Sequence, residues 1–68
     1  MPIEIVLNGE RRNARQGETV LELLEQLEID PARVAIELDR CILKRPLWAG
    51  TTLRAGSEIE IVQFVGGG

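Results

Sequence analysis

The side chains of this chain offer little for catalysis, so the group best suited to chemistry is the terminal carboxylate. The 68 residues include no histidine, no tyrosine and a single cysteine, Cys41. A nucleophile would need a base such as histidine, and no spacing of Cys, Asp or Glu predicts a metal site. The sequence ends Gly66-Gly67-Gly68. Glycine is the costliest residue to order, so we interpret this ending either as a frayed terminus or as the working part.

Composition and charge argue against several classes of protein. Apolar residues make up 44% and charged residues 28%, which is typical of one globular domain. The net charge of -3 argues against nucleic-acid binding, and we interpret Arg11, Arg12 and Arg15 as a solvated strand face. No apolar run approaches the roughly 20 residues that span a bilayer, and the first residues lack the features of a secretory signal. With one cysteine and no internal disulfide, we expect a reduced, cytoplasmic protein.

The first residues predict a β-hairpin. Residues 3–7 alternate between apolar and other side chains, as a half-buried strand does. Asn8-Gly9 favours a type I′ turn, because both positions of that turn need positive φ. Residues 10–15 then return as a polar strand, which has little to bury and suits a partly exposed position.

A helix is expected after this hairpin. Thr19 and Glu22 have the spacing of a capping box, in which each side chain accepts a hydrogen bond from the other residue's backbone. An apolar stripe at helical spacing follows, formed by Val20, Leu23, Leu24 and Leu27. We expect Asp30-Pro31 to end the helix, because a residue before proline avoids the α region. A helix this short needs a sheet to dock on.

The second half predicts three more strands. Residues 34–38 alternate, and residues 41–44 form a short strand after a tight turn at Asp39-Arg40. This turn lacks the usual glycine, so we expect it to distort the hairpin locally. Residues 46–50 are typical of an irregular or 3-10 segment, and residues 58–64 form the last strand. We interpret Trp48 as core or rim packing and Cys41 as a small strand residue.

This order of elements predicts an α+β domain of two layers. A hairpin, a helix across the sheet and then further strands give a mixed sheet of four to five strands with one main helix packed on one face. The first and last strands would be parallel neighbours at the centre, joined by a right-handed crossover. That is the β-grasp, or ubiquitin-like, architecture. We assign residues 1–64 to the β-grasp domain and residues 65–68 to a flexible C-terminal glycine tail.

The sequence resembles one family of this architecture over essentially its whole length. The motifs that carry the resemblance are Leu7-Asn8-Gly9-Glu10, Thr19-Val20-Leu21-Glu22-Leu23-Leu24, Val34-Ala35-Ile36-Glu37-Leu38, Arg45, Trp48 and the ending Glu60-Ile61-Val62-Gln63-Phe64-Val65-Gly66-Gly67-Gly68. Together they look like the ThiS-type sulfur carriers of thiamine biosynthesis. The ending is the most specific of these motifs, since Asn-Gly turns and capping boxes are common.

The resemblance implies a carrier and not an enzyme. The reactive group would be the α-carboxylate of Gly68, which an adenylating, E1-like partner activates with ATP. A sulfur donor, such as a cysteine desulfurase, would then convert the acyl adenylate to a C-terminal thiocarboxylate. Thiazole synthase would take this sulfur into the thiazole ring. The carrier itself would bind no cofactor and no metal.

The chemistry of the tail agrees with this implication. A carboxylate is a poor electrophile and needs activation by another protein, and glycines let the backbone approach that protein and its nucleotide closely. Three extended residues reach about 10 Å, but ordering each costs about 1–2 kcal/mol. A docking surface must offset this cost. The candidates for it are Val62, Phe64 and Val65 at the root of the tail, although Phe64 could equally be core.

Three other functions fit the same ending. A molybdopterin-synthase small subunit would donate sulfur to a different acceptor. A ubiquitin-like modifier would be joined to a lysine amine, giving conjugates on partner proteins. A β-grasp binding domain with an idle tail would tolerate loss of Gly67 and Gly68.

Overall fold

The computed structural model describes residues 1–64, and the predicted flexible tail at residues 65–68 lies outside them. The elements are β1 (Pro2–Leu7), β2 (Glu10–Arg15), α1 (Val20–Gln26), the 3-10 helix η1 (Pro31–Arg33), β3 (Val34–Leu38), β4 (Cys41–Leu43), the 3-10 helix η2 (Arg45–Gly50) and β5 (Glu58–Gln63). The strands form one sheet in the order β2-β1-β5-β3-β4. The pair β1–β5 is parallel and the other pairs are antiparallel, so the predicted mixed sheet with one main helix is confirmed.

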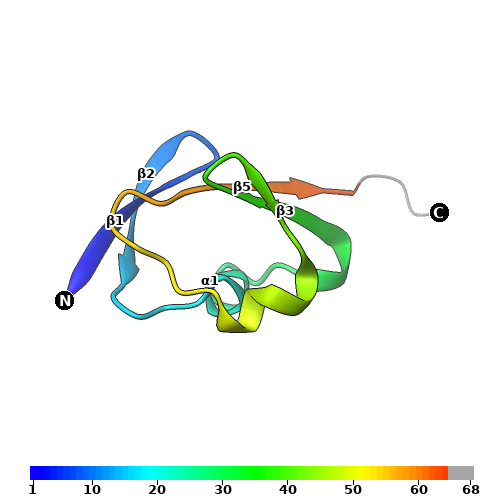
Figure 1. The fold of residues 1–68 in the computed structure, drawn as a ribbon, viewed down its shortest axis with the longest axis horizontal. Helices are drawn as coiled ribbons and strands as arrows, with labels where there is room; N and C mark the ends of the chain where they lie inside the picture. Colours follow the sequence, from blue (N-terminus) through cyan, green and yellow to red (C-terminus); the bar gives the residue numbers. More distant parts are fainter. Residues whose placement is uncertain (65–68) are drawn as a thin grey trace.

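The core lies between the sheet and α1, which lies on one face of the sheet (Figure 1). The two layers contribute large apolar side chains that are almost fully buried: Ile5, Val34, Ile36 and Ile59 from the strands, and Val20, Leu23 and Leu24 from the helix. Leu53 and Trp48 close the side of this core. Alternating strand positions therefore point at the helix, and the intervening positions form an outer face of the sheet.

The start of α1 follows its sequence signal. The Glu22 N–H donates to Thr19 Oγ1 at 3.1 Å, and the Thr19 N–H donates to Glu22 Oε1 at 2.9 Å, so the capping box is present. Of the predicted stripe, Val20, Leu23 and Leu24 are buried, and Leu27 is half-buried at the C-cap. The short helix is thus fixed by its cap and by the face that it buries.

The end of α1 differs from the prediction. The helix ends at Gln26, before Asp30-Pro31 is reached, and Pro31 instead opens η1. Glu28 has a φ of 58°, in the left-handed region. The Ile29 N–H donates to Leu24 O at 3.0 Å and the Glu28 N–H to Glu25 O at 3.1 Å, which is the Schellman arrangement. The sequence hides this cap because glutamate occupies a position that usually holds glycine.

The tight turn at Asp39-Arg40 also differs from expectation. Both residues have positive φ, 51° and 69°, as in a type I′ turn. The ladder continues directly from it, with Leu38 opposite Cys41, so the predicted distortion of this hairpin is wrong. The Asp39 N–H donates to Glu58 O at 2.7 Å, and Asp39 Oδ1 accepts from the Glu58 N–H at 3.0 Å. These bonds to β5 hold the turn without a glycine.

Candidate functional site at the end of the last strand

The site predicted from the sequence lies where β5 leaves the sheet. β5 runs between β1 and β3, with Ile59 buried against the helix layer. Val62 and Phe64 have exposed fractions of 54% and 58%, so Phe64 is not core. Val65 and the glycines at 66–68 lie outside the described residues. Two of the three predicted docking residues are therefore at the surface, directly before the tail.

Neighbouring strands add apolar side chains beside these two residues. Ala35 is the cross-strand partner of Val62, and both are exposed. Ile42 has an exposed fraction of 77%, and its partner on β3, Glu37, faces outward with Ala35 by the two-residue period of a strand. A shallow hollow is lined in part by Ala35, Ile42 and Phe64. We call Ala35, Ile42, Val62 and Phe64 the outer apolar patch.

The sequence prediction missed two members of this patch. Ala35 and Ile42 belong to strands in which the buried alternates, such as Val34 and Ile36, dominate the pattern. Ile42 was detectable as a large apolar residue next to Leu43, because neighbouring residues of a strand face opposite sides and only one of the two can point at the core. Its place beside β5, however, depends on the register of β3 with both neighbours.

Carboxylates border the patch on the same outer face. Glu37 is the cross-strand partner of Glu60, and both belong to the alternation that exposes Val62. Glu58 follows at the next outward position, where its Oε1 lies 3.8 Å from Arg40 Nε. The patch therefore adjoins an acidic strip on β3 and β5.

Trp48 is part of the core, as predicted. Its exposed fraction is 3%, and its Nε1–H donates to Leu43 O at 2.8 Å. The Arg45 guanidinium carbon lies 5.6 Å from the ring centroid, within cation–π range. The burial of Trp48 is thus explained by its packing in the core and its hydrogen bond to the last residue of β4.

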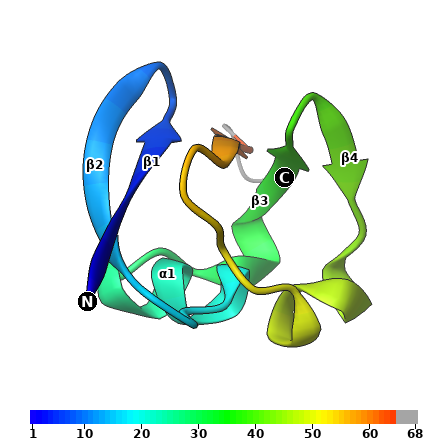
Figure 2. The ribbon, with the colours of Figure 1, turned by 60° about the vertical axis from the view of Figure 1, so that its left-hand side comes forward.

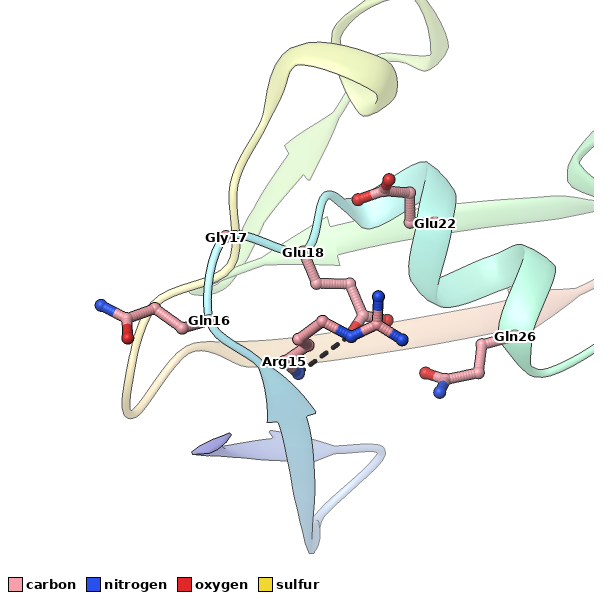
Figure 3. A pocket seen from close by; sticks show the side chains of 6 residues that line it. All are labelled: Arg15, Gln16, Gly17, Glu18, Glu22 and Gln26. Atoms are coloured by element: carbon pink, nitrogen blue, oxygen red, sulfur yellow. Dashed lines mark hydrogen bonds between the residues drawn. The ribbon is translucent and has the colours of Figure 1, made fainter. Parts of the chain in front are cut away.

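A polar hollow lies between the turn that follows β2 and the exposed side of α1 (Figure 3). It is lined by Arg15, Gln16, Gly17, Glu18, Glu22 and Gln26. Glu18 Oε1 accepts from the Arg15 N–H at 2.9 Å, and Glu22 caps the helix. Both carboxylates serve the backbone of the turn, and no lining residue is a nucleophile. The carboxylates of this hollow are therefore explained by the hydrogen bonds that they accept from the backbone.

The remaining chemistry-bearing groups are dispersed. Cys41 is exposed at the start of β4. Among residues 1–64, no three His, Cys, Asp or Glu side chains are grouped to hold a metal ion. In the same part of the chain, no helix combines the length and apolar character needed to cross a bilayer.

The fold and the exposed end of β5 define a ubiquitin-like β-grasp domain. The family model described as the ThiS family matches residues 5–68, the glycine ending included. The chain belongs to the ThiS family. Similarity to a solved structure agrees: the crystal structure of the thiamine biosynthesis protein ThiS from Geobacter metallireducens superposes with a TM-score of 0.84 at 29% identity, over 97% of this chain and 100% of that one.

Curated relatives are of two sizes. The sulfur carrier protein ThiS of Escherichia coli K12 is 33% identical over 66 residues, which cover 97% of this chain and 100% of that protein. Thiazole synthases of Magnetococcus marinus and Paramagnetospirillum magneticum are each 38% identical over 66 residues. The chain spans only 20% of the length of these two synthases. A carrier-like segment thus occurs both alone and within a longer thiazole synthase.

Proposed function

We propose that this protein carries sulfur for thiazole formation in thiamine biosynthesis. The observation that supports this most directly is that the ThiS family match runs through residue 68 and so includes the glycine ending. The relative from Escherichia coli, named a sulfur carrier, aligns over its whole length. Residues 1–64 form the carrier domain in this proposal, and residues 65–68 form the segment that reaches the partner's active site.

The carried group is the α-carboxylate of Gly68. An E1-like enzyme joins this carboxylate to the α-phosphate of ATP, releasing pyrophosphate and giving an acyl adenylate. A persulfide sulfur from a donor such as a cysteine desulfurase attacks the acyl carbon and displaces AMP. Reductive cleavage of the resulting acyl disulfide by a thiol leaves the thiocarboxylate, and thiazole synthase accepts its sulfur.

The carrier contributes binding and no catalytic group in this scheme. The outer apolar patch meets the adenylating enzyme and offsets the cost of ordering the glycines, which is about 1–2 kcal/mol for each residue. Val62 and Phe64 support this role because they are large, exposed and directly precede the tail. We include Val65 in the contact by its position in the sequence. The carrier holds no cofactor or metal of its own, and because ATP is consumed we place it in the cytoplasm.

Thiazole synthase is the proposed acceptor because two such enzymes contain a segment similar to this chain. A covalent link between carrier and synthase in one protein keeps the two partners at a high local concentration.

The test is intact mass spectrometry of the protein from cells that synthesise their own thiamine, with fragmentation of the C-terminus. We expect a mass increment of one oxygen-to-sulfur exchange on Gly68. A plain carboxylate that ATP and the adenylating enzyme also leave unmodified would contradict the proposal. Lysine-linked conjugates would indicate a protein modifier, and a thiocarboxylate that transfers sulfur only to a molybdopterin precursor would indicate the other carrier branch.

A further inference from the structure

β5 continues beyond the end of β1, the strand that covers one of its sides. The parallel ladder with β1 pairs Val6 with Glu58 and Leu7 with Ile59, and it stops there because β1 ends at Leu7. On the other side, β3 pairs with β5 as far as Gln63. The last part of β5 therefore has a strand on one side only. Figure 2 shows β1 and β3 on opposite sides of β5.

The Asn8 side chain covers the first backbone position beyond the end of β1. Asn8 Oδ1 accepts from the Ile61 N–H at 2.7 Å, and Asn8 Nδ2 donates to Ile61 O at 3.4 Å. The Asn8 N–H itself donates to Ile59 O at 2.8 Å. One amide side chain thus substitutes for one residue of a strand.

Gln63 is the next residue whose backbone faces this side. Successive residues of a strand direct their N–H and C=O groups to alternate sides, so those of Gln63 point the same way as those of Ile61. Phe64 points the opposite way, since its N–H donates to Arg33 O at 2.8 Å. Within residues 1–64, no hydrogen bond reaches the Gln63 backbone from the β1 side. β5 thus presents one unpaired donor and one unpaired acceptor beside the root of the tail.

An apolar groove lies beside this unpaired backbone. It has a volume of about 340 Å³ and is lined by Leu7, Asn8, Leu27, Ile29, Ile61 and Gln63. The four aliphatic residues are half-buried and pack against the core, so the walls of the groove are held in place. A strand added on this side would place alternate side chains toward the helix layer, where the groove lies.

We propose that this edge binds an extended segment of the adenylating enzyme, which pairs with Gln63 and places one apolar side chain in the groove. The unpaired backbone groups select an extended peptide, and the aliphatic walls select an apolar side chain. The strand leads directly into the tail on which that enzyme acts, so pairing here would fix the direction in which the tail enters. The inference rests on the proposed function and adds a second contact, on the side of β5 away from β3 and β4.

The other sheet edges lack this combination. β2 exposes Arg11, Arg12 and Arg15, and charged side chains on an edge oppose strand addition. β4 is only three residues long and is separated from β5 by β3. Among residues 1–64, only Gln63 combines an unpaired backbone, an apolar groove beside it and a position just before the tail.

Amide hydrogen exchange measured by NMR tests the proposal. In the free protein, we expect the Gln63 amide to exchange within about tenfold of its intrinsic rate, while the Phe64 amide is slowed by its bond to Arg33 O. Saturation with the adenylating enzyme should slow the Gln63 amide by at least about a further tenfold. A Gln63 amide that is already protected in the free protein, or that stays unprotected in the complex, would overturn the inference.

A substitution pair tests the same bond. Gln63→Pro removes the N–H, whereas Gln63→Ala changes the side chain and keeps it. We expect Gln63→Pro to bind the enzyme about fivefold to tenfold more weakly than Gln63→Ala, because both variants lose the side chain that lines the groove and only proline also loses the N–H. Equal affinity of the two variants would contradict backbone pairing. If Gln63→Pro fails to fold, the exchange measurement on the unmodified protein decides alone.

Thiocarboxylate formation separates this inference from the proposed function. A protein that is converted to thiocarboxylate while Gln63 stays unprotected in the complex would keep the function and lose the edge contact. A protein that neither binds the enzyme nor gains sulfur would lose both.

Discussion

Glu37 and Glu60 lie directly opposite each other on the outer faces of β3 and β5. Like charges at such a position destabilise a sheet by some tenths of a kcal/mol. The fold alone gives no reason for this pair, since alternating polar residues of any charge would suit an exposed face. The pair adjoins the outer apolar patch, so the acidic strip is a surface feature that folding does not require.

Relieving this repulsion should stabilise the free protein. We expect Glu60→Gln to raise the free energy of unfolding by about 0.2–1 kcal/mol in urea denaturation at low salt. Screening at 1 M salt shortens the Debye length to about 3 Å, and the gain should shrink. Glu4→Gln is the matched control because the cross-strand partner of Glu4 is the neutral Asn13. An equal gain from both substitutions would indicate an effect of net charge instead.

Substitution of Asn8 should lower the free energy of unfolding more than substitution of an exposed turn residue usually does. Asn8→Ala removes both bonds to Ile61 and leaves alanine at a φ of 50°. We expect a loss of about 1–3 kcal/mol of unfolding free energy. Asn8→Gly separates the two causes, because glycine accepts this φ but has no amide. Full retention of stability in Asn8→Gly would show that the bonds to Ile61 contribute nothing.

The helix C-terminus offers a stabilising substitution. Glu28→Gly places glycine at the left-handed position of the Schellman motif and removes a negative charge from the negative end of the helix dipole. We expect thermal unfolding to show a gain of about 0.5–1 kcal/mol. Glu28→Ala removes the same charge but keeps the strain of a Cβ. The Glu28→Gly variant should therefore be more stable than the Glu28→Ala variant. The reverse order would show that backbone strain at residue 28 is not the cause of the gain.

Phe64 should affect binding more than folding. With 58% of its surface exposed, Phe64→Ala should cost less than about 1 kcal/mol of unfolding free energy. Calorimetric titration with the adenylating enzyme should show affinity reduced by about tenfold or more, as for an aromatic hot spot. Leu47→Ala is the control, since Leu47 is similarly exposed but lies outside the hollow at the patch. Unfolding as the main effect of Phe64→Ala would instead assign Phe64 to the structural core.

Local signals in the sequence predicted most of the fold. Asn8-Gly9 and the Thr19/Glu22 box each fix a turn or a cap within a few residues, and the alternation of residues 34–38 predicted the strand that is found there. The end of α1 was missed because Glu28 adopts a glycine-like conformation that no residue type announced. The local bonds from the Glu28 and Ile29 N–H groups to Glu25 O and Leu24 O hold it there.

The candidate site was predictable only in part. Val62 and Phe64 stood out because they interrupt the apolar–polar alternation next to the glycines. Ile42 and the unpaired Gln63 edge depend on which strands neighbour β5 and on where β1 stops. Those relationships join residues far apart in the chain, and a single sequence does not encode them in any local pattern.

The position of β5 also has a consequence for how the chain folds. In the described sheet, β5 is the link between two hairpins, β1–β2 and β3–β4, which do not pair with each other (Figure 2). Each hairpin can form from neighbouring residues, but their union waits for residues 58–63, which are synthesised after both. Such long-range closure is slow compared with hairpin formation. The sheet is thus incomplete until the strand that leads to the glycines has paired with both hairpins.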